Sequence, residues 1–266
     1  MSGAEMFLTP ADAYDRYIGR YGPTLAAALI EFAGVEQGMR ALDVGCGTGA
    51  LTAAIADRLG VENVTGVDPS EPFAEACRTR LAGAHVEIAG AEMLPFADGV
   101  FDVVLSQLVL NFMSDATQGV AEMTRVTRPG GTVAACVWDY ADEMKLLRAY
   151  WDAAREVEPE RAADADEAAM RWCSPSELAD LWGGAGLDDV RTAPLIARAA
   201  YDSFEDLWDP LPTGVGPAGA FCKSLDDAGR AGLHDAFRRR LDVGDGPFEL
   251  NARAWGVAGI RPSELN

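Results

Sequence analysis

The strongest constraint on the fold is a Gly-rich stretch at residues 41–50, which reads Ala-Leu-Asp-Val-Gly-Cys-Gly-Thr-Gly-Ala. An apolar segment runs into an acidic residue, then into three glycines at alternate positions, and then into the apolar segment 51–56. Glycine lets the backbone bend tightly and approach a ligand closely, because it has no Cβ. A helix that begins after such a turn presents unpaired N–H groups and the positive end of its dipole. The stretch therefore predicts a strand, a turn and a helix that hold a polar ligand with an anionic part.

Two classes of ligand use this arrangement. The spacing Gly45-x-Gly47-x-x-Ala50 satisfies the dinucleotide fingerprint, and Asp68 follows at a separation that suits a ribose hydroxyl. This interpretation predicts an NAD(P)-dependent oxidoreductase. Such an enzyme usually needs a proton donor, and the chain has neither a Tyr-x-x-x-Lys pair nor a well-placed histidine.

The same residues also fit a second pattern. Read as Asp-x-Gly-x-Gly-x-Gly, the stretch resembles motif I of the class I S-adenosylmethionine (SAM) methyltransferases. The acid two places before the first glycine, the third glycine and further matching segments downstream favour this resemblance over the dinucleotide fingerprint. The resemblance implies SAM as the cofactor and assigns the following loop residues to its binding: Asp43, Gly45, Cys46, Gly47 and Gly49.

A second short strand, residues 63–68, also ends in an acid. A carboxylate at the end of a strand can accept hydrogen bonds from both hydroxyls of a ribose. The alternative is a plain capping turn, in which Ser70 begins the helix 71–81. Because the acid follows a Gly-rich loop, we favour binding and place Asp68 and Pro69 in the cofactor site.

The third strand, residues 86–89, leads into a more specific resemblance. The segments Ala-Glu-x-Leu-Pro-Phe at 91–96 and Asp-Gly-x-Phe-Asp-Val-Val at 98–104 are similar to the ubiquinone and menaquinone branch of the family, methyltransferase type 11. In that branch this loop brackets the adenine. The resemblance implies that Glu92 accepts from the exocyclic amine, helped by the backbone of Ala91 and Met93, and that Met93 and Leu94 suit a purine face.

The fourth strand, residues 101–106, is almost continuously apolar, as a strand buried on both faces of a parallel sheet should be. We place Gln107 and Leu108, which follow it, in the cofactor site. The Asn/Asp-Pro-Pro-aromatic motif of enzymes that methylate adenine or glutamine amides is absent here. The related small-molecule branch often has histidine near Asn111, and asparagine cannot take a proton.

The segment before the first strand allows two interpretations. Thr9-Pro10 predicts the start of a helix over residues 11–18. The helix is either a surface element with aromatic packing or a cap over the cofactor. In the second case Tyr14 and Arg20 lie near the methionine carboxylate.

The fifth strand, residues 132–138, follows a turn Arg-x-x-Arg-Pro-Gly-Gly that matches the family and that we expect to be structural, at the sheet end opposite the ligand. The strand leads to Asp139 and Tyr140, at the ligand edge. These are the candidates for a catalytic base. A helix cap and a packing tyrosine are the alternatives for the two residues.

The remaining pattern predicts a single domain over residues 1–266. Alternating strands and helices predict an α/β, doubly wound, seven-stranded and mostly parallel Rossmann-like sheet, with strands 6 and 7 at 187–200 and 248–257. The SAM-binding core covers 10–140. Helical inserts at 141–172 and 202–245, the second with a helix over 224–241, either pack into the core or form a lid over the acceptor, with glycines near Pro217 as hinges.

Composition limits the partners. A net charge of −20 disfavours nucleic acid and anionic membranes. Five scattered cysteines without C-x-x-C spacing read as reduced thiols, and with only two histidines we expect no metal site. His234 lies among arginines, where a solvated face is the better interpretation. The N-terminus lacks a basic segment before an apolar one, and no apolar run approaches ~20 residues, so we expect a cytoplasmic protein.

Together these features predict a SAM-dependent methyltransferase that acts on a small molecule by in-line displacement. The sulfonium methyl is already activated, so the protein chiefly aligns the nucleophile and excludes water, and a dedicated base is optional. Two alternatives remain, the NAD(P)-dependent oxidoreductase and a non-catalytic SAM-binding protein. The latter would lack a cavity beside the cofactor.

Overall fold

The structure of the chain, a computed structural model, describes residues 11–263, with the side chains described from residue 14. The expected helix start at Thr9-Pro10 therefore lies outside the described residues. One seven-stranded sheet occupies this part of the chain, in the order β3-β2-β1-β4-β5-β7-β6. The strands are β1 (Ala41–Val44), β2 (Val64–Asp68), β3 (His85–Ile88), β4 (Phe101–Gln107), β5 (Thr127–Trp138), β6 (Asp188–Tyr201) and β7 (Phe248–Ile260).

The first five strands are parallel because a helix or a long crossover returns the chain to the same edge between them. The crossovers contain α3 (Ala50–Leu59), α4 (Glu71–Arg80) and α5 (Ala116–Val126). Strand β7 instead pairs antiparallel with both β5 and β6. The order of strands reverses between β1 and β4, and ligands in such sheets bind at that point, outside the carboxyl ends of the strands. The predicted α/β class and mostly parallel sheet are confirmed.

Helices cover both faces of the sheet. On one face, α2 (Gly22–Ala33) and α3 bury Leu25, Leu29 and Ile55 against the sheet. On the other, α5 and α8 (Pro175–Gly184) bury Val120 and Trp182. Successive residues of a strand point to opposite faces, which is why the central strands are apolar almost throughout.

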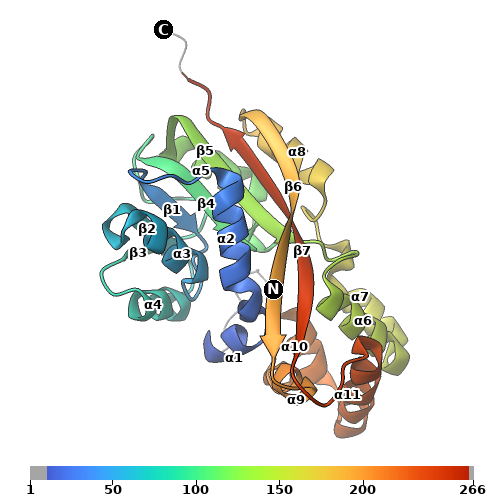
Figure 1. Cartoon of the computed structure of the whole chain (residues 1–266). Helices are drawn as coiled ribbons and strands as arrows, with labels where there is room; N and C mark the ends of the chain where they lie inside the picture. Colours follow the sequence, from blue (N-terminus) through green and yellow to red (C-terminus); the bar gives the residue numbers. More distant parts are fainter. Residues whose placement is uncertain (1–10, 264–266) are drawn as a thin grey trace.

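The two inserts form one helical lobe at the end of the long β6–β7 ribbon (Figure 1). We call α6 (Lys145–Val157), α7 (Pro159–Ala165), α9 (Phe204–Trp208), α10 (Gly216–Ser224) and α11 (Asp227–Leu241) the helical lobe. Tyr150 stacks edge-on against Trp151 and Phe237, with ring centroids 5.2 and 5.5 Å away. These rings belong to the same buried cluster as Trp138 at the end of β5. Core packing, one of the two interpretations of the inserts, is therefore present.

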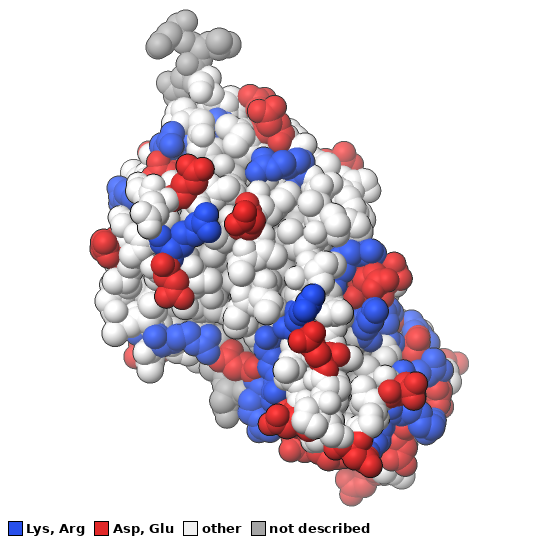
Figure 2. Space-filling model, viewed as in Figure 1, with Lys and Arg blue, Asp and Glu red and all other residues white. Residues whose placement is uncertain are grey.

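Charged side chains are interspersed over the helical lobe on the face that Figure 2 shows. Arg239 and Arg240 of α11 pair with Glu156 of α6 at 2.9 and 2.7 Å. His234 contacts Glu205 and Asp235, and its ring packs edge-on against those of Phe204 and Trp208. The residue is therefore partly buried and does not lie on the fully solvated face that we expected. Within residues 11–263, none of the helices combines the length and the apolar character that crossing a bilayer requires.

Four element boundaries differ from expectation. The first helix, α1 (Ala11–Arg16), ends early, and the 3-10 turn η2 (Ile18–Tyr21) replaces its last residues. The helix expected over 224–241 is interrupted at Asp226, which accepts from Gly229 N and so caps α11. Strand β5 begins at Thr127, because the Arg-Pro-Gly-Gly segment is a bulged part of the strand that pairs with β4. Strand β7 runs on to Ile260, since Gly256 and Gly259 leave room for Leu195 and Leu187.

Candidate functional site

A cavity of about 220 Å³ lies at the carboxyl ends of β1, β2 and β4, where the strand order reverses. The residues that line it come from the Gly-rich loop, the loops after β2, β3 and β4, and the helices α1 and α4. Nine residues predicted from the sequence are among them: Tyr14, Gly45, Gly47, Asp68, Pro69, Ala91, Glu92, Gln107 and Leu108.

The Gly-rich loop has the backbone that only glycine adopts easily. Gly45, Gly47 and Gly49 have φ of 76°, 53° and 90°. A Cβ on Gly49 would lie 2.9 Å from Cys77 Sγ, and one on Gly45 would overlap Val109. At Gly47 a Cβ would meet no protein atom within 4 Å. Gly45 and Gly49 therefore lack a side chain because neighbouring side chains occupy that space, whereas Gly47 borders open space in the cavity.

Asp68 joins two loops. Its Oδ2 accepts from Gly47 N at 2.9 Å, and its Oδ1 accepts from Ser70 N at 2.8 Å. Burial raises the pKa of Asp68, and the two backbone hydrogen bonds oppose that shift. Asp68 therefore both holds the turn before α4 and lines the cavity. Ser70 is the N-cap residue of α4, as the capping alternative expects, but its side chain makes no cap hydrogen bond.

Asp43 lies beneath the Gly-rich loop and is fully buried. Its Oδ2 accepts from Thr52 Oγ1 at 2.6 Å, while its Oδ1 has no hydrogen-bond partner within the described residues. Burial raises the pKa of Asp43 to about 8. Asp43 and Cys46 line a small space of about 50 Å³ that shares Gly45, Gly47 and Tyr14 with the larger cavity. A buried carboxylate oxygen without a partner is a place for a donor or a cation.

The loop after β3 forms the other end of the cavity. Glu92 Oε1 accepts from Ser114 N at 2.8 Å and Asp115 N at 3.2 Å, just before α5. Its Oε2 has no hydrogen bond within residues 11–263. Met93 is 80% exposed and Leu94 is buried under α5, so neither side chain provides the expected purine face. The reason is that the backbone turns at Met93, whose N–H donates to Gly90 O.

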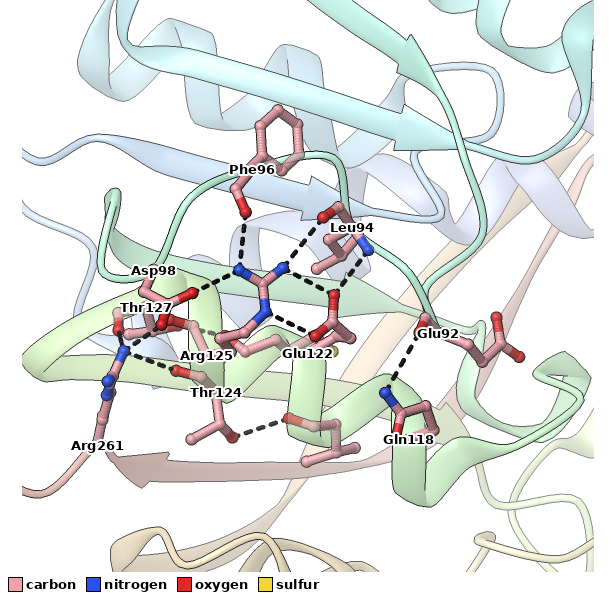
Figure 3. A network of polar contacts seen from close by, with 12 residues as sticks. Glu92, Leu94, Phe96, Asp98, Gln118, Glu122, Thr124, Arg125, Thr127 and Arg261 are labelled. Carbon is pink, nitrogen blue, oxygen red and sulfur yellow. Dashed lines mark hydrogen bonds and ion pairs between the residues drawn. The ribbon is translucent and has the colours of Figure 1, made fainter.

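An arginine that we had not predicted for the site holds this loop (Figure 3). Arg125 donates to Phe96 O at 2.8 Å and Leu94 O at 3.1 Å, and pairs with Asp98 at 2.7 Å. Glu122, three residues earlier on α5, pairs with Arg125 and accepts from Leu94 N at 2.9 Å. Arg125 opens the Arg-x-x-Arg-Pro-Gly-Gly motif. The Glu-x-x-Arg spacing on one helix was the signal that could have identified the clamp.

Several predicted residues lie elsewhere. Arg20 lines neither cavity described here, because its guanidinium pairs with Asp206 at 2.6 Å and donates to Ala200 O. Asp139 is buried, and its carboxylate pairs with Arg253 of β7. Asp139 lines none of the cavities described for the site. This placement corrects the proposed base role of Asp139. Gly49 packs behind the loop, as described above.

A third cavity, also of about 50 Å³, shares Tyr14, Leu108 and Phe112 with the larger cavity. We call it the aromatic cavity. Leu108, at the junction, has a φ of 64°, which is a strained backbone for a leucine and is a feature that clusters at functional sites. Lining residues from β5, its following loop, the helical lobe and the segments between the lobe's helices close it: Trp138, Tyr140, Leu147, Glu167, Val215 and Ala218.

Within the described part of the chain, no group of three or more His, Cys, Asp or Glu residues is arranged to hold a metal ion. The polar side chains that line the larger cavity are instead two carboxylates, an amide and three hydroxyls: Asp68, Glu92, Gln107, Tyr14, Ser70 and Ser114. This donor set suits an organic ligand with hydroxyl and amine groups.

Comparisons with known proteins point the same way. The family model described as a methyltransferase domain matches residues 42–135. A demethylmenaquinone methyltransferase of Roseiflexus castenholzii is 35% identical over 57% of this chain and 68% of its own length. A malonyl-(acyl-carrier protein) O-methyltransferase of Salmonella typhimurium is 31% identical over 69% of this chain and 80% of its own. A solved phosphoethanolamine N-methyltransferase 2 of Haemonchus contortus, in complex with S-adenosyl-L-methionine, is 16% identical with a TM-score of 0.59, covering 95% of this chain and 57% of that one.

Proposed function

Because this chain belongs to the class I SAM-dependent methyltransferases, we propose that it transfers a methyl group to a small molecule held in the aromatic cavity. Its cofactor is S-adenosylmethionine. When bound, this cofactor supplies a methyl group on a positively charged sulfur, which is a strong electrophile.

The larger cavity fits the cofactor on several separate grounds. The open space at Gly47 admits a ligand against the backbone, as at the first turn of other nucleoside-binding sheets. Asp68 lines the cavity where a ribose would lie, and Glu92 lines its far end with one oxygen unpartnered. In the small space beside the cavity, the partnerless Oδ1 of Asp43 can form a hydrogen bond with the methionine part. In this arrangement Gln107, Leu108 and Tyr14 complete the walls.

The observation that carries the small-molecule acceptor is the aromatic cavity itself. It is small, adjoins the cofactor cavity, and is walled by residues of the helical lobe. A nucleic-acid strand or a folded protein does not fit such a space, and a net charge of −20 also opposes nucleic acid. The presence of this cavity also argues against a non-catalytic SAM-binding protein. No observation favours the NAD(P)-dependent oxidoreductase.

The residues of this chain act mainly by position. Tyr14, Leu108 and Phe112 border both cavities, so they align the acceptor with the cofactor. Val215 and Ala218 exclude water from the acceptor side. The inserts thus pack into the core and also wall the acceptor, which combines the two interpretations of the sequence.

The test uses a volume change in one cavity. Small molecules that bind the cofactor-loaded wild type are first identified by thermal shift. Ala218→Leu should fill the aromatic cavity and abolish the binding of these molecules, while its affinity for S-adenosylhomocysteine stays unchanged. Ala162→Leu, an equal change at a buried α7 position outside the cavity, is the matched control. Hits that still bind to Ala218→Leu would place the acceptor elsewhere. In a separate calorimetric titration, NAD binding without S-adenosylhomocysteine binding would refute the methyltransferase site.

A further inference from the structure

One carboxylate lines the aromatic cavity. Glu167 begins the short 3-10 helix η5 (Glu167–Ala169) and is 4% exposed. Its Oε2 accepts from Trp151 Nε1 at 2.9 Å, while its Oε1 accepts no hydrogen bond within the described residues. No lysine or arginine of that part of the chain lies within ion-pair distance of it. A buried carboxylate that lines a cavity and lacks a partner on one oxygen has an unmet requirement for a donor, which a ligand can supply.

The neighbouring acid explains why Glu167 lacks a cation. Asp166 pairs with both nearby arginines, Arg148 and Arg155, and also caps η5 by accepting from Ala168 N at 2.8 Å. Two adjacent acids therefore have different surroundings. Asp166 is fixed by charge, and Glu167 is held by one neutral donor in an apolar place.

This environment suits proton transfer near neutral pH. Burial is the main cause that raises the pKa of Glu167 to about 7, while the Trp151 hydrogen bond and Arg148 lower it and Asp166 raises it. A base works best when its pKa lies near the working pH. The other titratable groups that face it are hydroxyls and a thiol whose pKa values burial raises, so they stay neutral: Tyr17, Tyr140, Tyr150 and Cys173.

We propose that Glu167 is the general base of this enzyme, and that the acceptor is a small molecule bearing a weakly acidic hydroxyl on an apolar ring. The inference rests on the proposed function. The walls of the aromatic cavity supply apolar and aromatic surface from Tyr14, Phe112 and Trp138, and Glu167 is the charged residue among its described lining. A flat ring with one hydroxyl matches both features.

The step balances without a further reactant. A lone pair of the acceptor oxygen forms the new O–C bond as the C–S bond breaks, and its electron pair stays on sulfur. The hydroxyl proton passes to the Glu167 carboxylate and from there to solvent. S-adenosylhomocysteine and the methyl ether are the products.

The test uses the full chain, SAM and 2-naphthol as the probe, with 2-naphthylamine for comparison. We expect Glu167→Gln to keep its S-adenosylhomocysteine affinity and to slow single-turnover methylation of 2-naphthol at pH 8 by about 100-fold or more. The wild-type rate should rise with pH to a plateau above about 7, and the variant should lack that step. The amide oxygen of glutamine still accepts from Trp151, so the variant keeps the local packing.

A binding readout accompanies the rates. Because Trp151 donates to Glu167, its fluorescence should titrate with the carboxylate, and 2-naphthol with S-adenosylhomocysteine should move that midpoint. Trp151→Phe provides the fluorescence blank. It also removes a donor that lowers the pKa of Glu167, so this variant should remain active but with a pH–rate profile shifted to higher pH.

Three results would overturn the inference. The first is an unchanged rate and pH profile in folded Glu167→Gln, and the second is no binding of 2-naphthol to the cofactor-loaded wild type. The third is methylation of 2-naphthylamine but not of 2-naphthol. Failure to bind S-adenosylhomocysteine would instead refute the proposed function, so the two failures are distinguishable.

Discussion

The backbone N–H of Gly47 donates a hydrogen bond to Asp68 Oδ2 at 2.9 Å. Through this bond the acid at the end of β2 holds the loop at the end of β1, although 21 residues separate them in the chain. The protein's own contacts therefore fix the shape of the loop, which reduces the ordering cost of binding.

Gly47→Val should abolish S-adenosylhomocysteine binding, because a branched side chain would enter the cavity and resist a φ of 53°. Gly34→Val is the matched control. Gly34 also has a positive φ, 71°, and open space around a Cβ, but it ends α2 away from the cavity. Calorimetry should show lost affinity only for Gly47→Val, with similar unfolding costs in both. Near-normal affinity in folded Gly47→Val would remove this loop from the site.

Asp68→Ala should weaken S-adenosylhomocysteine binding by about 1.5–3 kcal/mol, the range for hydrogen bonds to a charged group. It should also lower the free energy of unfolding, since Gly47 N and Ser70 N lose their acceptor. Asp68→Asn keeps one acceptor oxygen and should lose less of both. A dissociation constant unchanged in Asp68→Ala would show that the acid serves only the turn.

Asp43 should make the protein less stable as pH rises. The unfolded chain releases this proton near the ordinary pKa of 3.8 and the folded protein near about 8. Between these two pKa values the folded state holds a proton that the unfolded state has released. The stability that Asp43 contributes is therefore fully present below the unfolded pKa and is lost as the pH rises to the folded pKa. Denaturant titrations at pH 5 and 8 should show this loss in wild type and in the exposed control Asp57→Asn. Asp43→Asn should show a smaller loss, and equal pH dependence in all three proteins would contradict the assignment.

Arg125→Ala should weaken S-adenosylhomocysteine binding and destabilise the fold, because two carbonyls and two carboxylates lose their shared donor. We expect about 1–3 kcal/mol of lost unfolding free energy. Arg128→Ala is the control from the same motif. Arg128 pairs with Asp102 near the start of β4, away from the cavity. If both variants bind equally well, the clamp does not shape the cofactor site.

Much of this site was predictable because its residues lie at the ends of strands. The chain pattern identifies each strand, and a parallel sheet brings the carboxyl ends of its strands to one edge. That is why Gly47, Asp68, Glu92 and Gln107 meet in one cavity. The same reasoning failed for Asp139. This residue follows the end of its strand as predicted, but its carboxylate is held by Arg253, which lies on a strand more than a hundred residues later.

The unpredicted residues depend on contacts that no local pattern records. Glu167 is one of several acids in an Ala-, Glu- and Arg-rich segment, and only the folded lobe shows that Asp166 takes the arginines. Arg20 lies on the segment before the first strand, where we expected a cap over the cofactor, yet Asp206 of the helical lobe holds it. Burial and ion pairing between distant segments decide these roles.

The paired strands β6 and β7 carry the helical lobe at the end where β6 stops at Tyr201 and β7 starts at Phe248 (Figure 1). The segment between the two strands, residues 202–247, holds α9, α10 and α11 and leaves the ribbon at that end. The cofactor loops all precede residue 115. A gene encoding this architecture can therefore gain or lose sequence within this segment, altering the acceptor wall that Val215 and Ala218 form, and retain its methyl-donor half.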